Sequence, residues 1–172
     1  MRTVLTALTA LMLFATPVVA GDWEDARAAY RLGDFQKAFR LFKPFAEQGY
    51  AKAQSILGMM YADGEGVPED DAKAAYWLGK GAEQGSVETQ TNLGVMYVKG
   101  EGLPKDYAKA LHWFRKAAER GFAGAQYNLG VMYGKGRGVP ENNVKAYAWW
   151  SIAAARGHKS AKGNKGIIKE QM

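Results

Sequence analysis

Apolar and small residues recur along the chain in a pattern that repeats every 36 residues. Each copy has two stretches with apolar residues at spacings of three and four, separated by a glycine-rich loop that contains a proline. Such spacing is typical of amphipathic helices, and a fixed period of this length is typical of stacked repeats. The pattern predicts an all-α protein, an α/α solenoid of helical hairpins, in which each repeat has a helix A followed by a helix B.

Residues related by the shift of 36 form columns, and the columns that keep their residue type identify the expected core. They are Leu57, Leu93 and Leu129; Gly58, Gly94 and Gly130; Met60, Met96 and Met132; Tyr61, Tyr97 and Tyr133; and Trp77, Trp113 and Trp149. We expect the leucines and methionines to face inward and the glycines to mark a close helix crossing. We also expect the tryptophans to be core residues, whose truncation to alanine costs about 3–5 kcal/mol.

The same pattern divides the chain into segments. Residues 1–20 are typical of a signal peptide, with Arg2 before an apolar run and a cleavage site after Ala20. We therefore expect a periplasmic or secreted protein that has no stable membrane insertion after cleavage. Residues 21–49 form a hairpin with a shorter loop, followed by full repeats at 50–85, 86–121 and 122–157. Residues 158–172 are expected to form a basic capping helix, because Lys165 stands in the leucine column.

Composition narrows the possible functions. The chain has no cysteine, which excludes a disulfide framework and thiolate chemistry. Residues 50–85 carry three basic and six acidic side chains, whereas residues 86–172 carry fourteen basic and six acidic ones. This asymmetry can direct an anionic partner toward one end, or it can be a solvated surface without a ligand.

No motif for catalysis or for a cofactor is evident. His112 and His158 have no companions at ligand spacing, and no serine lies in a nucleophile elbow. The acids at 69–71 fit a helix start, and the glycine-rich loops have no preceding strand to form a phosphate site. We therefore expect a protein that is not an enzyme, with no metal or cofactor. Export and the placement of aromatic residues in core columns also argue against nucleic-acid binding.

These repeated motifs resemble the Sel-one-like repeat (SLR) family, a relative of the tetratricopeptide repeats. Gly-x-Met-Tyr, Gly-x-Gly-Val-Pro, Lys-Ala and Ala-Ala-Glu-x-Gly carry the resemblance over residues 50–157, while the hairpin at 22–48 is closer to a tetratricopeptide repeat. The resemblance implies an α-solenoid adaptor or scaffold in protein complexes, often of the bacterial envelope. Some cysteine-rich members are linked to β-lactam binding or hydrolysis, and the lack of cysteine here makes a hydrolase the third alternative.

The expected binding surface is the concave face formed by the A helices, where columns vary in chemistry. Its candidate residues are Ser55, Met59, Thr91, Val95, Lys99, Tyr127, Val131 and Lys135. An apolar strip flanked by lysines favours a protein or peptide segment with some acidic character, and Tyr127 is the expected aromatic anchor. The main alternative is an anionic envelope polymer bound by the basic C-terminal half, including Lys159, Lys162 and Lys165. The oligomeric state stays open.

Overall fold

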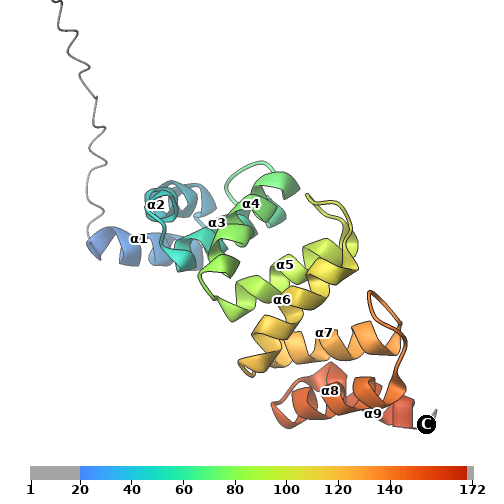
Figure 1. The fold of residues 1–172 in the computed structure, drawn as a ribbon. Helices are drawn as coiled ribbons and strands as arrows, with labels where there is room; N and C mark the ends of the chain where they lie inside the picture. The colour runs from blue at the N-terminus through green and yellow to red at the C-terminus, as the bar shows by residue number, and fades with distance from the viewer. Residues whose placement is uncertain (1–19, 170–172) are drawn as a thin grey trace, which may run out of the picture.

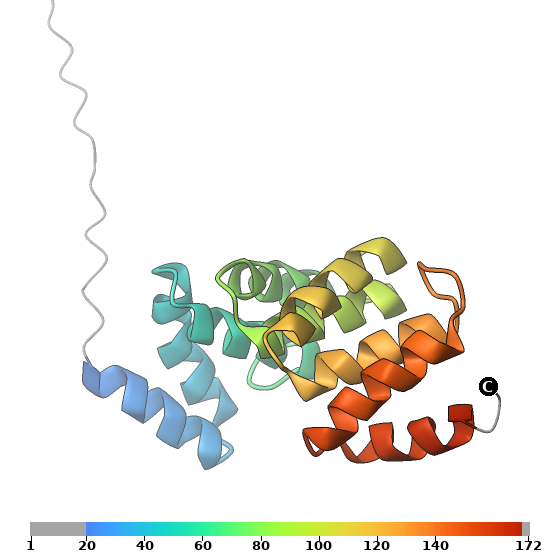
Figure 2. The ribbon, with the colours of Figure 1, turned by 60° about the horizontal axis from the view of Figure 1, so that its bottom comes forward.

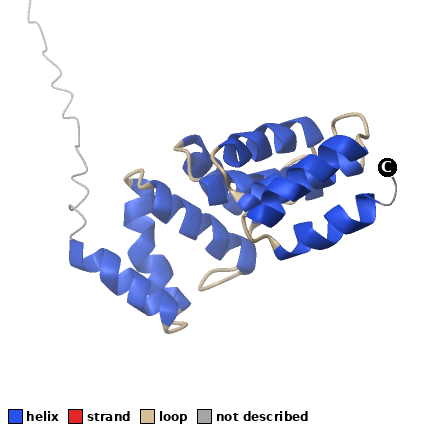
Figure 3. Ribbon diagram, turned by 90° about the horizontal axis from the view of Figure 1, so that it is seen from below, coloured by secondary structure: helices blue, strands red, loops and turns tan. Residues whose placement is uncertain are grey.

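A computed structural model describes residues 20–169, which form nine helices and no strand (Figure 3). The helices are α1 (Ala20–Arg31), α2 (Phe35–Glu47), α3 (Ala51–Asp63), α4 (Asp71–Glu83), α5 (Val87–Lys99), α6 (Tyr107–Glu119), α7 (Ala123–Gly134), α8 (Asn143–Ala155) and α9 (Lys159–Lys169). The expected signal peptide, residues 1–20, lies outside the described residues apart from Ala20, where α1 begins.

The helices stack in the order of the sequence. Each packs mainly against the helix before and the helix after it, so that the array runs from α1 at one end to α9 at the other (Figures 1 and 2). Helices α3, α5 and α7 are the A helices of the three repeats, and α4, α6 and α8 are their B helices. The predicted all-α solenoid of helical hairpins is confirmed.

The B helices begin in the same way in each repeat. The side chains of Asp70, Asp106 and Asn142 accept hydrogen bonds from the backbone N–H groups three residues later, at 2.9, 2.9 and 2.8 Å. Such bonds satisfy one of the N–H groups that a helix start leaves without an intrahelical partner. The preceding A helices α3 and α5 end at Gly64 and Gly100, whose φ angles of 67° and 81° suit glycine.

The core follows the leucine, methionine and glycine columns, as predicted. Leu57, Leu93 and Leu129 are at most 3% exposed. A Cβ atom added at Gly58 would lie 2.7 Å from Leu78 Cγ, and one at Gly94 would lie 2.5 Å from Phe114 Cε1. The glycines therefore make room for a large side chain of helix B.

The tryptophan column is less buried than we predicted. Trp77, Trp113 and Trp149 are half-buried, and the fully buried position is the next residue of each B helix, as at Phe114, which is 1% exposed. Trp77 packs against the cluster around Phe45 and Leu57, and Trp149 packs against the cluster around Phe114 and Leu129. Both rings thus contact buried residues of the stack while part of each side chain stays exposed.

A glutamine column connects consecutive units. Gln54, Gln90 and Gln126 are buried, and each donates from Nε2 to a carbonyl oxygen near the end of the preceding helix, at 3.1, 3.0 and 3.1 Å. The acceptors are Ala46, Ala82 and Ala118. The last carbonyl groups of a helix lack intrahelical donors, so the glutamine amide stabilises the junction.

Candidate functional site

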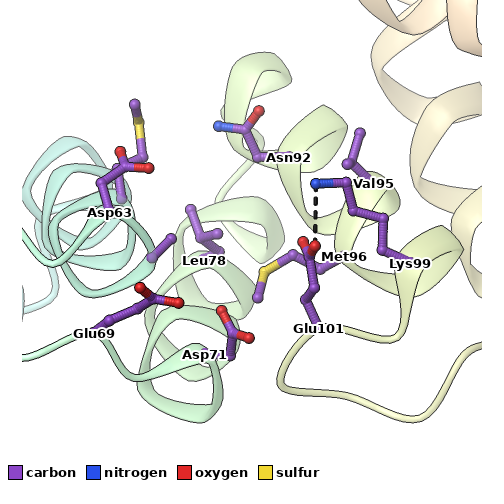
Figure 4. Close-up of a pocket in the computed structure, with 11 residues that line it drawn as sticks. Asp63, Glu69, Asp71, Leu78, Asn92, Val95, Met96, Lys99 and Glu101 are labelled. Atoms are coloured by element: carbon purple, nitrogen blue, oxygen red, sulfur yellow. Dashed lines mark ion pairs between the residues drawn. The ribbon is translucent and has the colours of Figure 1, made fainter.

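A groove of about 430 Å³ lies between α3 and α5, and its floor is formed by Leu78 and Met96 (Figure 4). We call it the acidic groove. The remaining lining residues are Met59, Ala62, Asp63, Glu69, Asp71, Asn92, Val95, Lys99 and Glu101. The repeat geometry explains its position, because neighbouring A helices stand side by side and helix B of the first repeat lies beneath them.

Four carboxylates and one ammonium group surround this apolar floor. Asp63, Glu69 and Asp71 lie on the side of α3 and the start of α4, and the ion pair between Lys99 Nζ and Glu101 Oε1, 3.1 Å long, lies on the side of α5 (Figure 4). Because the single lysine is already paired, the charge left over in the groove is negative. A cationic group would gain Coulomb energy there, more than in bulk water because the walls reduce solvent screening.

Three of the eight residues predicted for the binding surface line this groove. Met59 is 40% exposed, Val95 is half-buried, and Lys99 is exposed. Val95 also packs against the core cluster around Phe114, so only part of its side chain is available to a ligand. The structure therefore brings one end of the predicted apolar strip together with one of its two lysines.

Ser55 and Thr91 do not offer free side chains to a partner. The Ser55 hydroxyl donates to the carbonyl oxygen of Ala51 at 2.9 Å and pairs with the Thr89 hydroxyl. Thr91 is only 7% exposed and donates to the carbonyl oxygen of Val87 at 2.8 Å. Both hydroxyl groups are thus engaged within the protein, that of Ser55 with α3 and α5 and that of Thr91 within α5.

The last three predicted residues lie farther along the stack. Tyr127 is half-buried and stacks on His158, with ring centroids 4.4 Å apart and an interplanar angle of 12°. Val131 packs against the cluster around Trp150, and Lys135 is exposed directly after α7. Tyr127 thus already has an aromatic partner within the chain, and none of the three lines the acidic groove.

The expectation of an acidic partner segment does not fit this groove. Lys99 was expected to orient a partner's carboxylate, but it pairs with Glu101. The sequence explains Glu69 and Asp71 as acids at a helix start, and the structure places both in the lining of the groove. The sequence does contain one indication of the groove when equivalent positions of neighbouring repeats are compared. Asp63 and Glu69 of the first repeat are replaced by Lys99 and Lys105 in the next.

Within residues 20–169, no three histidine or acidic side chains come close enough to hold a metal ion, so the groove carboxylates are separate charges. None of the helices in this part of the chain is both long and apolar enough to cross a membrane. The arrangement provides an apolar floor and fixed negative charge, which are means of recognition.

One further contact beside the first repeat perturbs a titration. The Tyr30 hydroxyl donates to Glu65 Oε2 at 2.7 Å, which ties the N-terminal hairpin to the loop of the first repeat. Burial, and then the hydrogen bond to the Glu65 carboxylate, raise the pKa of Tyr30 to about 12. Glu65 is thereby engaged within the protein, as Glu101 is by Lys99, unlike Asp63, Glu69 and Asp71 of the groove.

Solved structures with the same fold include three that the chain resembles in sequence. A protective antigen of uropathogenic Escherichia coli displaying an SLR fold is 37% identical, with a TM-score of 0.79 over 88% of this chain and 35% of the antigen. A Sel1 repeat protein from Oxalobacter formigenes is 32% identical, with a TM-score of 0.79 over 84% of this chain and 59% of that protein. The chain therefore spans about a third of the first protein and about three fifths of the second.

The third is the cysteine rich protein B of Helicobacter pylori, which is 26% identical, with a TM-score of 0.57 over 74% of this chain and 95% of that protein. A search among curated proteins found no match.

The Sel1 repeat model matches residues 29–50, 51–86, 87–122 and 123–158, which is most of the chain. Proteins built from these repeats are generally scaffolds for protein–protein interaction, and the fold is generally non-catalytic. The repeat pattern, the stacked hairpins and the matched residues agree, and the chain belongs to the Sel1 repeat family.

Proposed function

We propose that this protein is an exported, non-enzymatic binding module that recognises a segment of another protein in the acidic groove between α3 and α5. The observation that carries the proposal is the combination of an apolar floor, Leu78 and Met96, with unpaired carboxylates around it. Export follows from the expected signal peptide and gives a periplasmic or secreted location. In that setting the module acts as an adaptor or regulator of the cell envelope.

The size and chemistry of the groove favour one or two side chains of a partner. A volume of about 430 Å³ accommodates side chains of an extended or helical segment, not a folded domain. Met59, at the exposed edge, gives the partner's apolar residue a flexible surface to pack on. Asp63, Glu69 and Asp71 favour a lysine or arginine beside that residue. The charges should set orientation and association rate, and the apolar contact should supply most of the affinity.

A variant with reversed charges in the groove tests this proposal, and the introduced residues already occur at the same columns of the next repeat. Asp63→Lys, Glu69→Lys and Glu101→Arg introduce the residues of the next repeat at the same columns, namely Lys99, Lys105 and Arg137. The probe is a synthetic peptide with a leucine flanked by arginines, measured by fluorescence anisotropy. We expect the swap to weaken binding by about 10- to 100-fold, since it replaces attraction by repulsion.

The matched control makes the same change in charge outside the groove. Asp25→Lys, Glu83→Lys and Glu119→Lys alter exposed acids that do not line the groove, and salt screens such charges. Peptide affinity should stay within about twofold of the wild type. Equal loss in both variants would mean that net charge, not the groove, attracts the peptide. Binding that is unchanged in the swap variant, while its helix content and melting temperature are preserved, would refute the proposed site.

Export has its own test. Cell fractionation and N-terminal sequencing of the full-length chain should find a protein that begins at Gly21 outside the cytoplasm. An intact Met1 on a cytoplasmic protein would contradict export and leave the groove experiment unaffected.

A further inference from the structure

A second groove, of about 610 Å³, lies at the opposite end of the stack between α8 and α9. We call it the C-terminal groove. Its lining residues are Tyr147, Ser151, Ala154 and Ala155 of α8, and Lys162, Lys165, Gly166 and Lys169 of α9. One wall is therefore mostly apolar and the other is basic.

The equivalent position in the preceding repeat is not a groove, because helix B of the following repeat covers it. Leu111 and Ala118, one repeat before Tyr147 and Ala154, are 6% and 3% exposed in the cluster against which Trp149 of α8 packs. Tyr147 and Ala154 are only half-buried, and no described helix follows α9 to cover them. The C-terminal groove thus has the position that a helix occupies in the preceding repeat.

The outer side of α8 extends this apolar surface. Val144 is 68% exposed and Ile152 is 42% exposed, on the same helix, three residues before Tyr147 and one residue after Ser151. Lys80 and Lys116 stand in the column of Ile152 in the earlier repeats. A helix that is apolar around most of its circumference is normally covered, so α8 has the character of a helix with a partner.

The opposite wall, formed by α9, carries lysines where the A helix of the preceding repeat has residues that pack in the stack. Lys162, Lys165 and Lys169 stand in the columns of Gln126, Leu129 and Tyr133. Lys165 Nζ lies 5.4 Å from the centroid of the Tyr147 ring. The Ser151 hydroxyl, buried at the foot of the groove, has no hydrogen-bond partner among the described residues. Three ammonium groups and an unpaired hydroxyl group all suit carboxylate acceptors.

We propose that the C-terminal groove binds an amphipathic helical segment of a partner protein, with its apolar stripe against Tyr147 and Ala154 and its carboxylates toward Lys162, Lys165 and Lys169. This occupant completes the stack in the way that the next helix B does in the earlier repeats. A second copy of this chain fits less well, since paired C-terminal ends bring six lysines of the two grooves together. A polyanion uses the lysines but leaves the apolar wall of α8 uncovered.

The test measures binding to full-length mature protein by fluorescence anisotropy with three probes. The first is an amphipathic peptide of about 14 residues, or four helical turns, with a leucine stripe and a row of glutamates. The second has lysines in place of the glutamates, and the third is polyglutamate of the same charge as the first. We expect the first probe to bind at least about tenfold more tightly than either of the others, because only it matches both walls.

Two variants identify the groove as the site. Lys162→Glu/Lys165→Glu/Lys169→Glu should weaken binding of the first probe by about tenfold or more, whereas Lys80→Glu/Lys105→Glu/Lys116→Glu, with the same charge change elsewhere, should not. Ala155→Glu places an acid on the rim, where Glu83 and Glu119 stand in the earlier repeats, and should weaken it about threefold while leaving the melting temperature unchanged.

The outcomes separate the possibilities. Equal or tighter binding of polyglutamate means that the surface binds a polymer through charge alone and overturns the proposal. Absence of binding by the first probe, or equal loss with both lysine variants, overturns it as well. Neither result affects the acidic groove, because Asp63→Lys, Glu69→Lys and Glu101→Arg lie at the other end of the stack.

Discussion

The acidic groove and the corresponding surface one repeat later are built by the same columns and differ in both space and charge. In the first, Ala62 and Leu78 leave room, and Asp63 and Glu69 are acidic. In the second, the larger Val98 and Phe114 stand at these columns. At the columns of Asp63 and Glu69, the second surface has the basic residues Lys99 and Lys105.

The difference shows that stacking and recognition use separate columns. Leu57 and Leu93, like Met60 and Met96, are buried in both places and hold the helices in the same arrangement. The columns that face outward reverse their charge without altering this arrangement. One backbone geometry thereby presents a negative surface near one end of the array and a positive one farther along.

The largest expected effect is on stability, at the residue that fills the second surface. Phe114→Ala should cost about 3–5 kcal/mol, because Phe114 is 1% exposed and the cavity cannot fully collapse. Trp113→Ala should cost less, since Trp113 is half-buried. Urea unfolding followed by circular dichroism measures both. A larger loss for Trp113→Ala would mean that the tryptophan column, not the next one, carries the packing.

A smaller loss of folding stability is expected when a methyl group is added at a glycine of the glycine column, Gly58, Gly94 and Gly130. Gly94→Ala should cost about 1–3 kcal/mol, because its Cβ atom would overlap the Phe114 ring. Gly163 of α9 is the matched control, since nothing lies within 4 Å of a Cβ atom there. Gly163→Ala should be neutral or stabilise the protein by up to about 1 kcal/mol through helix propensity. A stable Gly94→Ala protein would show that α5 and α6 can separate at little cost.

Converting the second surface into a copy of the first would sharpen the comparison further. Val98→Ala, Phe114→Leu and Lys105→Glu install the residues of the first repeat at three columns and leave unchanged Lys99, which lines the acidic groove. The variant should bind a second leucine–arginine peptide with an affinity within about tenfold of the first, a difference of about 1.4 kcal/mol. Calorimetric titration gives the number of sites. A stoichiometry that stays at one, in a folded variant, would mean that the columns alone do not define the site.

The smallest expected effect concerns pH and the Tyr30–Glu65 bond. The pKa of Tyr30 is raised to about 12 in the folded protein, and it is about 10 in an unfolded chain. The stability from this bond is therefore fully present below about pH 10 and lost as pH rises toward about 12. The difference in urea midpoint between the wild type and Tyr30→Phe should be constant up to about pH 10 and shrink as the pH rises toward about 12. A constant difference would indicate that the hydroxyl group remains unperturbed.

The stack of hairpins could be predicted from the sequence because the same residue types recur at the same spacing in each repeat. The glycine column recurs three times at one spacing, and each glycine adjoins a large residue of helix B. The tryptophan column recurs as regularly, but its burial was overestimated, since position 77 and position 78 both lie near the inner side of α4 and only packing decides between them.

The site was predicted only in part, because grooves depend on contacts between units. Helix spacing placed Met59 and Val95 on a shared surface, and both line the acidic groove. It could not show that Thr91 is buried or that His158, directly before α9, stacks on Tyr127. Those contacts arise from the angle between successive hairpins, which no single helical period contains.

The glutamine column has a consequence for how the array opens. Gln54, Gln90 and Gln126 each tie an A helix to the helix before it, but α9 has Lys162 in this column, and Lys162 lines the C-terminal groove. The amide hydrogens of α9 should therefore exchange with deuterium faster than those of α7. Faster exchange in α9 would mean that this helix opens while the preceding repeats stay closed, so that the stack loosens from one end.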